Sequence, residues 1–474
     1  MRKLFREQSV LLISVFKWVV LSTGVGIVVG ASTALFLNIL EWSSVRASGY
    51  SYYYVLLPLA LFLSAFLTKY LAPDAEGHGT EKVIEAVHKN FGRIRARVVP
   101  VKLFATVVTL ALGGSAGKEG PCAQIGAGMA SGVADILRFN DIDRKKLVIC
   151  GISSGFAAVF GTPIAGAIFG VEVLVVGSLL YDVLLPSFIA GITSYEVAAY
   201  LGVSYPHIPS NFTMVFSESF FLKTMLSGVF FGLCSVLLII MLKFGKTVSE
   251  KIKVWLPLKG IIGGVLLLAL AFAFSPQYLG LGLDTVHGAL GGQQTVWYAF
   301  ILKALCTSIT LNFGGSGGIV TPIFFIGASS GTWYAQFMGL DTATFAAIGL
   351  VALLAGAANT PIAASIMAVE LFGPTIAPYA AVACVISFLM TGYRSVYPSQ
   401  LLSIQKSAAM HVELGKEIEH ANPEIRPIPD GLVDKSLKIV DKSIDLVDRH
   451  VNKRMDQSVK MSERIMNFFK TMFK

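Results

Sequence analysis

Apolar residues form long runs along most of the chain, and polar residues are confined to short segments between them. Three intervals, Lys17–Glu41, Lys146–Glu172 and Lys303–Asp341, contain no charged residue between their ends. A helix crosses the hydrocarbon core of a bilayer with ~20 apolar residues. Because runs of about this length recur, the pattern predicts an all-α protein that crosses a membrane several times.

Other apolar segments are shorter than a full span and are interrupted by glycine or proline. The expected full or nearly full spans cover 10–40, 50–71, 222–242, 260–274 and 297–311. The shorter pieces cover 98–112, 121–137 and 147–160, followed by a broken stretch at 314–397. A broken helix leaves backbone groups unpaired, and these must face protein or a water-filled path because lipid cannot bond them. The interruptions therefore favour a transporter or channel over a membrane anchor.

Composition agrees with this class of protein. Hydrophobic residues make up 54% of the 474 positions and charged residues only 14%, against roughly a quarter charged in ordinary domains. These values exclude a cytosolic enzyme and a coiled-coil rod. All five cysteines lie in apolar segments without CxxC spacing, so they are interpreted as small buried side chains and not as a disulfide framework.

The basic residues that give the chain its net charge of +9 lie next to the apolar runs. Basic residues gather near the N-terminus, at Lys89–Arg97, at Arg144–Lys146 and in the C-terminal tail. This is the positive-inside pattern, so the charge indicates a membrane partner and not nucleic acid. We expect an integral, multi-pass protein of the inner or plasma membrane with both termini in the cytoplasm. The first apolar run is too long for a cleavable signal.

The chain contains two related halves. The sequence GGSAGKEGP at 113–121 matches GGSGGIVTP at 314–322, and PIAGAIFGVE at 163–172 matches PIAASIMAVE at 361–370. Two motifs in the same order at nearly the same offset indicate a duplication, although the repeat itself does not say whether the halves are inverted. The expected parts are a cytoplasmic N-terminal segment (1–9), a first membrane repeat (10–210), a second membrane repeat (211–411) and a charged cytoplasmic tail (412–474).

Each GGSxGxxxP motif ends an apolar segment and opens a new helix at its proline. Proline suits the first helical turn, and glycine lets backbone approach a ligand closely. The start of the new helix presents unpaired N–H groups and the positive end of the helix dipole. Two such starts that face one another predict an anion site near mid-membrane. The alternative interpretation is close helix packing through small residues.

Glu119 lies in the first of these helix starts, where the second half has Val320. A carboxylate at membrane depth indicates function by default. Glu119 is an anion tethered where a free anion would bind, so its protonation predicts a gate and a candidate proton carrier. The alternative is a structural carboxylate paired with Lys118. The segment does not match a phosphate loop, because the first glycine and the Ser/Thr of that motif are missing.

Three other polar residues accompany the repeats. Glu172 and Glu370 occupy equivalent positions in the second motif, and a structural role at helix ends is as compatible with them as a functional one. His78 lies at another glycine-flanked helix start, at 77–82. No spacing predicts a metal site or a cofactor, and no nucleophile–base arrangement predicts an enzyme.

These motifs resemble the CLC family of chloride channels and proton-coupled chloride antiporters, in its prokaryotic form without CBS domains. Residues 117–121 (GKEGP) resemble the family's G(K/R)EGP motif, residues 318–322 (GIVTP) its GxFxP motif, and residues 395–398 (SVYP) the start of its last membrane helix. The resemblance implies a homodimer with one pore per subunit and a fold of two inverted repeats built from many tilted, partial helices. It implies Glu119 as the gate. It implies an anion site formed by Ile319, Val320, Tyr397, His78, Gly117 and Gly318.

Two departures from the family bear on mechanism. His78 stands where the family has an anion-coordinating serine, so selectivity is not fixed by the resemblance. Val173 stands where many antiporters carry a second, internal proton glutamate, and Glu172 matches the acidic residue beside it. The missing carboxylate favours an uncoupled, gated channel for chloride or a similar anion. The alternative is a proton/chloride antiporter with another internal proton path, in which Glu119 and Glu172 are the proton-path candidates.

The tail carries apolar residues at heptad spacing over 433–451. This spacing is compatible with a short coiled coil, with a basic amphipathic helix on the membrane surface and with a solvated extension. A different class of function also fits, a non-conducting membrane scaffold whose tail recruits partners.

Overall fold

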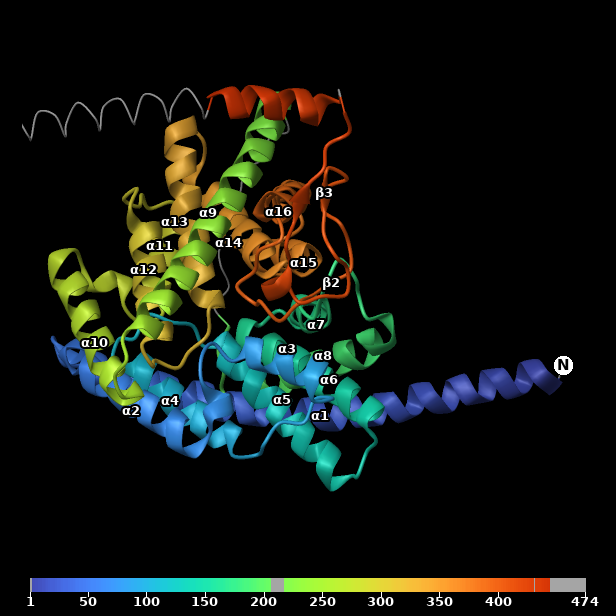
Figure 1. The fold of residues 1–474 in the computed structure, drawn as a ribbon. Coiled ribbons are helices and arrows are strands. Elements are labelled where there is room, and N and C mark those ends of the chain that lie inside the picture. The colour runs from blue at the N-terminus through green and yellow to red at the C-terminus, as the bar shows by residue number, and fades with distance from the viewer. Residues whose placement is uncertain (1, 206–216, 430, 444–474) are drawn as a thin grey trace, which may run out of the picture. The chain divides into compact units, whose positions relative to one another are not determined.

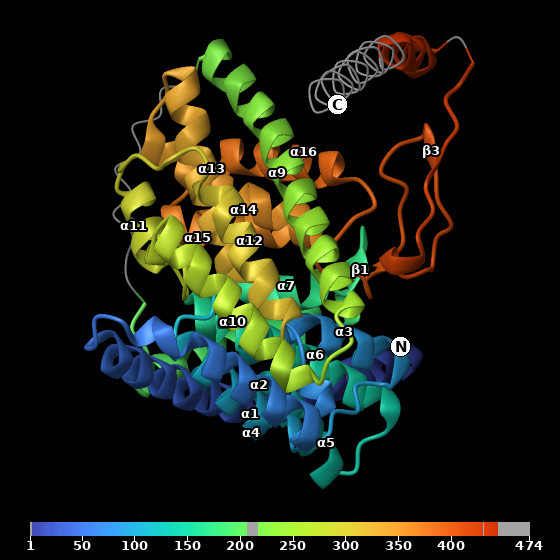
Figure 2. The same ribbon diagram turned by 60° about the vertical axis from the view of Figure 1, so that its left-hand side comes forward.

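A computed structural model of the chain describes residues 2–205, 217–429 and 431–443. It divides into two compact units, 1–404 with 414–420, and 405–413 with 421–474. The first unit is almost entirely helical (Figures 1 and 2). The helices of its first half are α1 (Arg2–Ser48), α2 (Leu57–Leu71), α3 (Thr80–Lys89), α4 (Val98–Ala111), α5 (Glu119–Ile136), α6 (Asp141–Phe160), α7 (Pro163–Glu172) and α8 (Tyr181–Tyr200).

The second half repeats the first element by element. Its helices are α9 (Glu218–Lys251), α10 (Leu256–Ala273), α11 (Leu283–Leu290), α12 (Ala299–Asn312), α13 (Val320–Met338), α14 (Thr342–Ala358), α15 (Pro361–Phe372) and α16 (Ala377–Thr391). Short 3₁₀ turns precede α2, α3 and α11, at Tyr53–Leu56, Pro73–Ala75 and Pro276–Tyr278. In both views most first-half helices, blue to teal, lie below most second-half helices, green to orange, and α10 reaches down beside α2.

The two halves are joined at their GGSxG motifs. The Gly117 N–H donates to the Gly318 carbonyl at 2.7 Å, and the Gly318 N–H donates back to the Gly117 carbonyl at 2.5 Å, in an antiparallel bridge. Equivalent segments of the two halves therefore run antiparallel where they meet, in agreement with a two-fold relation between the repeats. Together with the helix content, this arrangement confirms the predicted all-α fold of inverted repeats.

Hydroxyl groups extend this reciprocal bonding away from the bridge. The Ser115 N–H donates to the Thr310 hydroxyl at 3.0 Å, and the Ser316 N–H donates to the Thr109 hydroxyl at 3.1 Å. All four residues are buried. Each half thus supplies the acceptor that the other half's helix break leaves missing, which accounts for the polar residues inside apolar segments.

Reciprocal bonding recurs at the second repeated motif. Glu172, at the end of α7, accepts from the Ile362 and Ala363 N–H groups at 3.0 and 2.8 Å. Glu370, near the end of α15, accepts in the same way from Ile164 and Ala165 at 3.0 and 2.7 Å. Each carboxylate therefore satisfies the free N–H groups at the start of the other half's helix, where a negative charge is also favoured by the helix dipole.

Five of the described helical segments are long and apolar enough to cross a membrane: Arg2–Ser48, Tyr53–Leu71, Tyr181–Tyr200, Glu218–Lys251 and Leu256–Ala273. Shorter apolar helices lie among them, including α4, α7, α12 and α14–α16. Helix α1 runs without a break for 47 residues from Arg2, so the segment 1–9, predicted to be cytoplasmic, is helical from Arg2 onward. The helix breaks expected from the sequence occur at the two glycine motifs, between α4 and α5 and between α12 and α13.

Two short strand pairs complete the description. In the first unit β1 (Val175–Val176) pairs in parallel with β2 (Leu401–Leu402). In the second unit β3 (Met410–His411) pairs antiparallel with β4 (Glu424–Ile425), and a helix follows at 432–443. This helix covers the start of the predicted heptad series; the positions from 444 onward lie outside the described residues.

Candidate functional site

The carboxylate of Glu119 lies at the start of α13 in the opposite half. Its side chain is buried with 3% exposure. One oxygen accepts from the backbone N–H of Thr321 at 3.0 Å, and the other accepts from the Thr321 hydroxyl at 2.5 Å. A negatively charged group thus occupies the helix start at which the sequence predicts a free anion. Its bonds are to Thr321 and not to Lys118, which was the alternative partner.

Thr321 is a site residue that the sequence pattern did not single out. Its hydroxyl is aligned with the first turn of α13, which begins at Val320, so both of its donors face the same carboxylate. The available signal was its place between Val320 and Pro322, inside the motif that opens the helix. A hydroxyl at the first helical turn adds a side-chain donor to the free backbone donors.

The remaining residues of the motif have different tasks. Gly117 and Gly318, both expected to bind the anion, use their N–H groups to bond each other. The N–H groups of Ile319 and Val320 have no acceptor in the described part of the chain. The backbone N–H groups of Ile319 and Val320 are therefore the free donors at the N-terminus of α13. They lie next to Thr321, whose N–H and hydroxyl bond Glu119.

Two aromatic residues bring further polar atoms to this region. Tyr397 is completely buried, and its ring centroid lies 5.8 Å from that of His78. The Tyr397 hydroxyl, the His78 Nδ1 and the Thr80 hydroxyl are buried without a hydrogen-bond partner among the described residues. Buried polar atoms without a partner are costly, and three of them from one neighbourhood indicate a site for a polar or charged solute.

The loop that carries His78 is fixed against the gate helix. A Cβ atom on Gly120, the residue after Glu119, would collide with the His78 carbonyl oxygen, so this position requires glycine. The buried Lys102 of α4 donates to the Ala75 and Gly77 carbonyls at 3.1 and 2.6 Å. Backbone contact on one side and an ammonium group on the other thus hold the loop beside Glu119.

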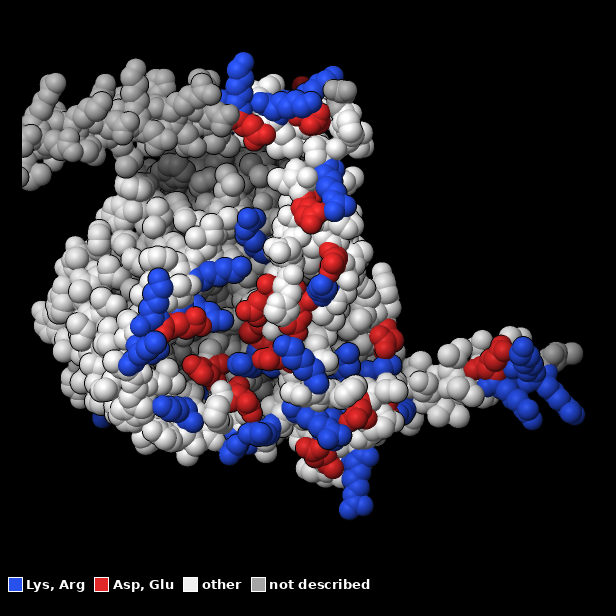
Figure 3. Space-filling view, viewed as in Figure 1, with Lys and Arg blue, Asp and Glu red and all other residues white. Residues whose placement is uncertain are grey.

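A cavity of about 490 Å³ reaches this loop from the surface. We call it the vestibule; it is lined by Gly77, His78, Glu81, Ser395 and Ser399 and by lysines and glutamates of α3, α9 and α10. Figure 3 shows charged side chains gathered in the lower middle of one face, while the left flank is almost free of them. The charges therefore mark where the bundle is open to water, in agreement with an aqueous route to His78.

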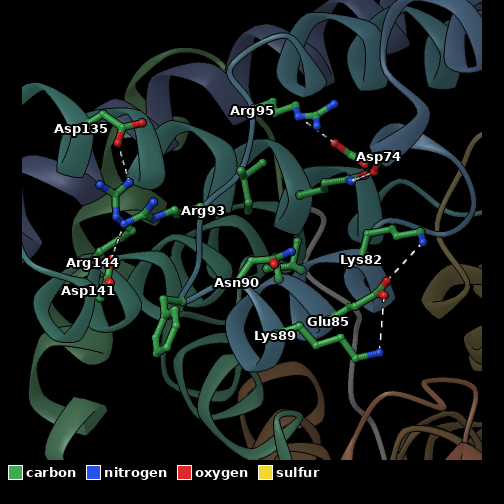
Figure 4. Close-up of a pocket in the computed structure, with 15 residues that line it drawn as sticks. Asp74, Lys82, Glu85, Lys89, Asn90, Arg93, Arg95, Asp135, Asp141 and Arg144 are labelled. Atoms are coloured by element: carbon green, nitrogen blue, oxygen red, sulfur yellow. Dashed lines mark hydrogen bonds and ion pairs between the residues drawn. The ribbon is translucent and has the colours of Figure 1, made fainter.

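A second cavity, of about 970 Å³, lies beside α3 and the loop that joins it to α4. Its basic side chains are engaged in ion pairs with acidic neighbours (Figure 4). The pairs are Arg144–Asp135, Arg93–Asp141, Arg95–Asp74, Lys82–Glu85 and Lys89–Glu85, at 2.6 to 3.7 Å. Arg93–Asp141 attaches the α3–α4 loop to α6, and Arg95–Asp74 attaches it to the turn at Pro73–Ala75. Arg144–Asp135 joins α6 to α5. We interpret these pairs as structural and not as part of the anion site.

Glu172, a proton-path candidate from the sequence, is not at the vestibule. Both of its oxygens are bonded to the start of α15. The adjacent Val173 is fully buried, and its carbonyl accepts from the Gln400 amide at 2.8 Å. The geometry therefore favours the structural interpretation of Glu172, which the sequence had left even with the functional one.

Comparison with known proteins fits this geometry. The family model described as voltage gated chloride channel matches residues 60–392. The chain belongs to this family. The match covers both helix starts and the gate candidate, so the CLC resemblance predicted from the motifs is confirmed. As a member of the CLC family, the protein is an integral, multi-pass membrane protein that transports anions.

Similar CLC proteins include channels and exchangers by name. The chain is 34% identical over 420 residues to the "Chloride/fluoride channel protein" of Pseudomonas syringae pv. tomato, covering 87% of this chain and 92% of that one. It is 28% identical to the "H(+)/Cl(-) exchange transporter ClcA" of Klebsiella pneumoniae, covering 68% and 72%. The crystal structure of a CLC-type fluoride/proton antiporter superposes with a TM-score of 0.78 at 28% identity, over 82% and 98% of the two chains.

Proposed function

We propose that this CLC protein moves chloride or fluoride along a path that Glu119 closes. The observation that supports the proposal is the bonding of the Glu119 carboxylate to Thr321 at the start of α13. A bound halide would use the same kind of donors, the free N–H groups of Ile319 and Val320. Partial charges of this kind hold an anion without trapping it, as conduction requires.

Protonation is the step that opens the gate. A carboxylate is held by Thr321 through two charge-assisted hydrogen bonds, each worth about 1.5–3 kcal/mol. The neutral acid loses this advantage and also its favourable interaction with the helix dipole. Glu119 then leaves the start of α13, and a halide takes its place.

Fluoride is included because of the chemistry around Tyr397 as well as the names of the relatives. Fluoride is a small anion that needs strong donors to replace its water. The Tyr397 and Thr80 hydroxyls and the His78 ring supply unpartnered groups of that kind, and His78 replaces the serine expected from the family. We therefore expect fluoride to be transported at a rate comparable to or above that of chloride.

The decisive experiment is anion efflux from liposomes that contain the purified protein. Fluoride-loaded and chloride-loaded vesicles are measured with ion-selective electrodes at two pH values, with protein-free vesicles as the control. We expect efflux that accelerates as the pH falls, because protonation frees the gate. An absence of efflux of either ion would overturn the proposal and favour the non-conducting scaffold.

Coupling to protons is a separate question. Val173 is apolar where an internal proton carrier is expected, and this alone favours an uncoupled channel. An exchanger needs another internal acid. The reversal potential under a pH gradient distinguishes the two, because a channel holds the Nernst potential of the anion and an exchanger departs from it. Homodimer assembly and cytoplasmic termini stay predictions of the sequence.

Replacing Tyr397 by phenylalanine tests its place in the anion site. The hydroxyl has no partner in the described part of the protein, so its removal should leave the melting temperature unchanged. Anion binding should weaken about fivefold to tenfold, the value of one hydrogen bond of roughly 1 kcal/mol or slightly more. Isothermal titration with fluoride and chloride measures both affinities, and unchanged affinities would remove Tyr397 from the site.

A further inference from the structure

Glu81 has a carboxylate with one bonded and one free oxygen. It lies in the first turn of α3, where Oε1 accepts from the Ser399 N–H at 3.0 Å and from the Ser399 hydroxyl. The second oxygen, Oε2, is buried and has no hydrogen-bond partner among the residues that the structure describes. Ser399 therefore fixes the orientation of the group and leaves Oε2 free to take up a proton.

Water reaches this carboxylate from one side. Glu81 lines the vestibule together with His78 and Ser399. The charged and titratable groups that face it come from its own helix, from the preceding loop, from α9 and α10, and from the segments after α16. They are Lys82, Glu85, Lys89, Glu76, His78, Lys243, Lys246, Glu250, Lys259, Tyr397 and Glu419.

The position of Glu81 gives it a proton affinity suited to neutral pH. Glu81 lies outside the candidate membrane spans, because its helix α3 is not among the helices that are long and apolar enough to cross a membrane. Burial raises the pKa of the Glu81 carboxyl to about 7, against the opposing effect of the two Ser399 hydrogen bonds. A group with a pKa close to the ambient pH exchanges protons efficiently in both directions.

The loop that precedes Glu81 packs against the gate helix. One turn of backbone separates Glu81 from His78, whose carbonyl packs against Gly120, the neighbour of Glu119. The His78 Nδ1 is buried without a partner beside Tyr397. Tyr397 lies within electrostatic range of both Glu81 and Glu119. His78 and Tyr397 therefore lie close to one another in the neighbourhood of both carboxylates.

Other acids near the path lack this combination. Glu172 and Glu370 have both oxygens bonded to helix starts. Glu85 forms ion pairs with Lys82 and Lys89. Glu81 thus combines burial, a free oxygen and contact with the vestibule.

We propose that Glu81 is the proton-transfer residue at the vestibule end of the path, and that the protein exchanges protons for halide. The inference rests on the proposed function, since it needs Glu119 as the second acid. A hydronium ion in the vestibule protonates the Glu81 carboxylate and leaves water. The acid then returns to carboxylate as its proton passes, by way of water, to Glu119. Neutral Glu119 leaves α13, releases its proton to the solution on the opposite side and returns as a carboxylate, while a halide crosses in the opposite direction.

The test is Glu81→Gln in liposomes under a pH gradient, with proton uptake and halide efflux measured together. Glutamine keeps the shape and an acceptor for Ser399 but cannot carry the proton. We expect the number of protons taken up per halide released to fall at least about tenfold, so that the halide efflux that remains is no longer coupled to the pH gradient. Glu81→Asp should restore part of the proton uptake. Glu196→Gln, on the exposed face of α8, is the matched control and should behave as the wild type.

The outcomes separate this inference from the proposed function. Halide efflux without proton uptake in the wild type, or wild-type coupling in Glu81→Gln, would overturn the role of Glu81 and leave anion transport intact. No halide efflux in the wild type would overturn both. If Glu81→Gln fails to fold, Ser399→Ala replaces it. That change removes one bond to the carboxylate and should shift the midpoint of proton coupling to higher pH, whereas a structural role predicts no shift.

Discussion

Replacing Glu119 by alanine should give halide flux that no longer depends on pH. The wild-type carboxylate competes with the halide at the start of α13 and is displaced only when it is protonated. Alanine cannot compete, so the start of the helix is permanently available. Two charge-assisted bonds to Thr321 amount to several kcal/mol, and each 1.4 kcal/mol is about a factor of ten in occupancy. We therefore expect flux at neutral pH to rise at least about tenfold.

The measurement is halide efflux from liposomes between mildly acidic and mildly alkaline pH. Efflux through the wild type should increase as the pH falls, and efflux through Glu119→Ala should be level across the range. Proton uptake should vanish in the variant. Thr321→Val serves as a graded comparison, because it keeps the carboxylate and the backbone donor but removes the hydroxyl. If the folded alanine variant loses halide flux, Glu119 is part of the conducting structure and not its gate.

Removing Glu172 should destabilise the fold, and more strongly than removing Glu370. Glu172→Ala strands the Ile362 and Ala363 N–H groups, and the side chain that bonds them has only 4% exposure. Unsatisfied buried donors cost about 1–3 kcal/mol each, so we expect a loss of about 2–4 kcal/mol. Glu370 is only half-buried, and water can replace part of its bonding. Its alanine variant should lose about 1–2 kcal/mol.

Unfolding in detergent, followed by tryptophan fluorescence, compares the two variants with exposed Glu196→Ala. Glu172→Gln adds a functional readout, because an amide oxygen retains one of the two bonds. That variant should fold and keep its proton coupling. A folded Glu172→Gln protein with normal halide flux but no proton uptake would instead make Glu172 a proton carrier, the role that the sequence also allowed.

The repeat made much of the architecture predictable. The two glycine motifs located the helix breaks and, with them, Glu119 and the start of α13. Local rules for proline and glycine sufficed there because each helix start depends on a few adjacent residues. The equivalence of Glu172 and Glu370 was also visible, but their partners lie in the opposite half and no local pattern names them.

Thr321 and Glu81 were not singled out for the same reason. Each is an ordinary polar residue in the sequence, and its meaning comes from a residue far along the chain. Thr321 meets Glu119, 202 positions away, and Glu81 meets Ser399, 318 positions away. Helix α1 shows that the end of an apolar run does not locate the end of a helix. The apolar run places the start of the first span near residue 10, but the helix itself begins at Arg2.

The mutual bonds of Gly117 with Gly318, and of Ser115 and Ser316 with threonines across the bridge, bear on how the protein is made. During synthesis the first half emerges with these groups lacking their acceptors, since every acceptor lies about two hundred residues downstream. The helix break of the first half can adopt its final conformation only after the second half has been inserted. The duplicated gene therefore encodes a protein that completes its folding late in translation. Neither half would be fully folded without the other.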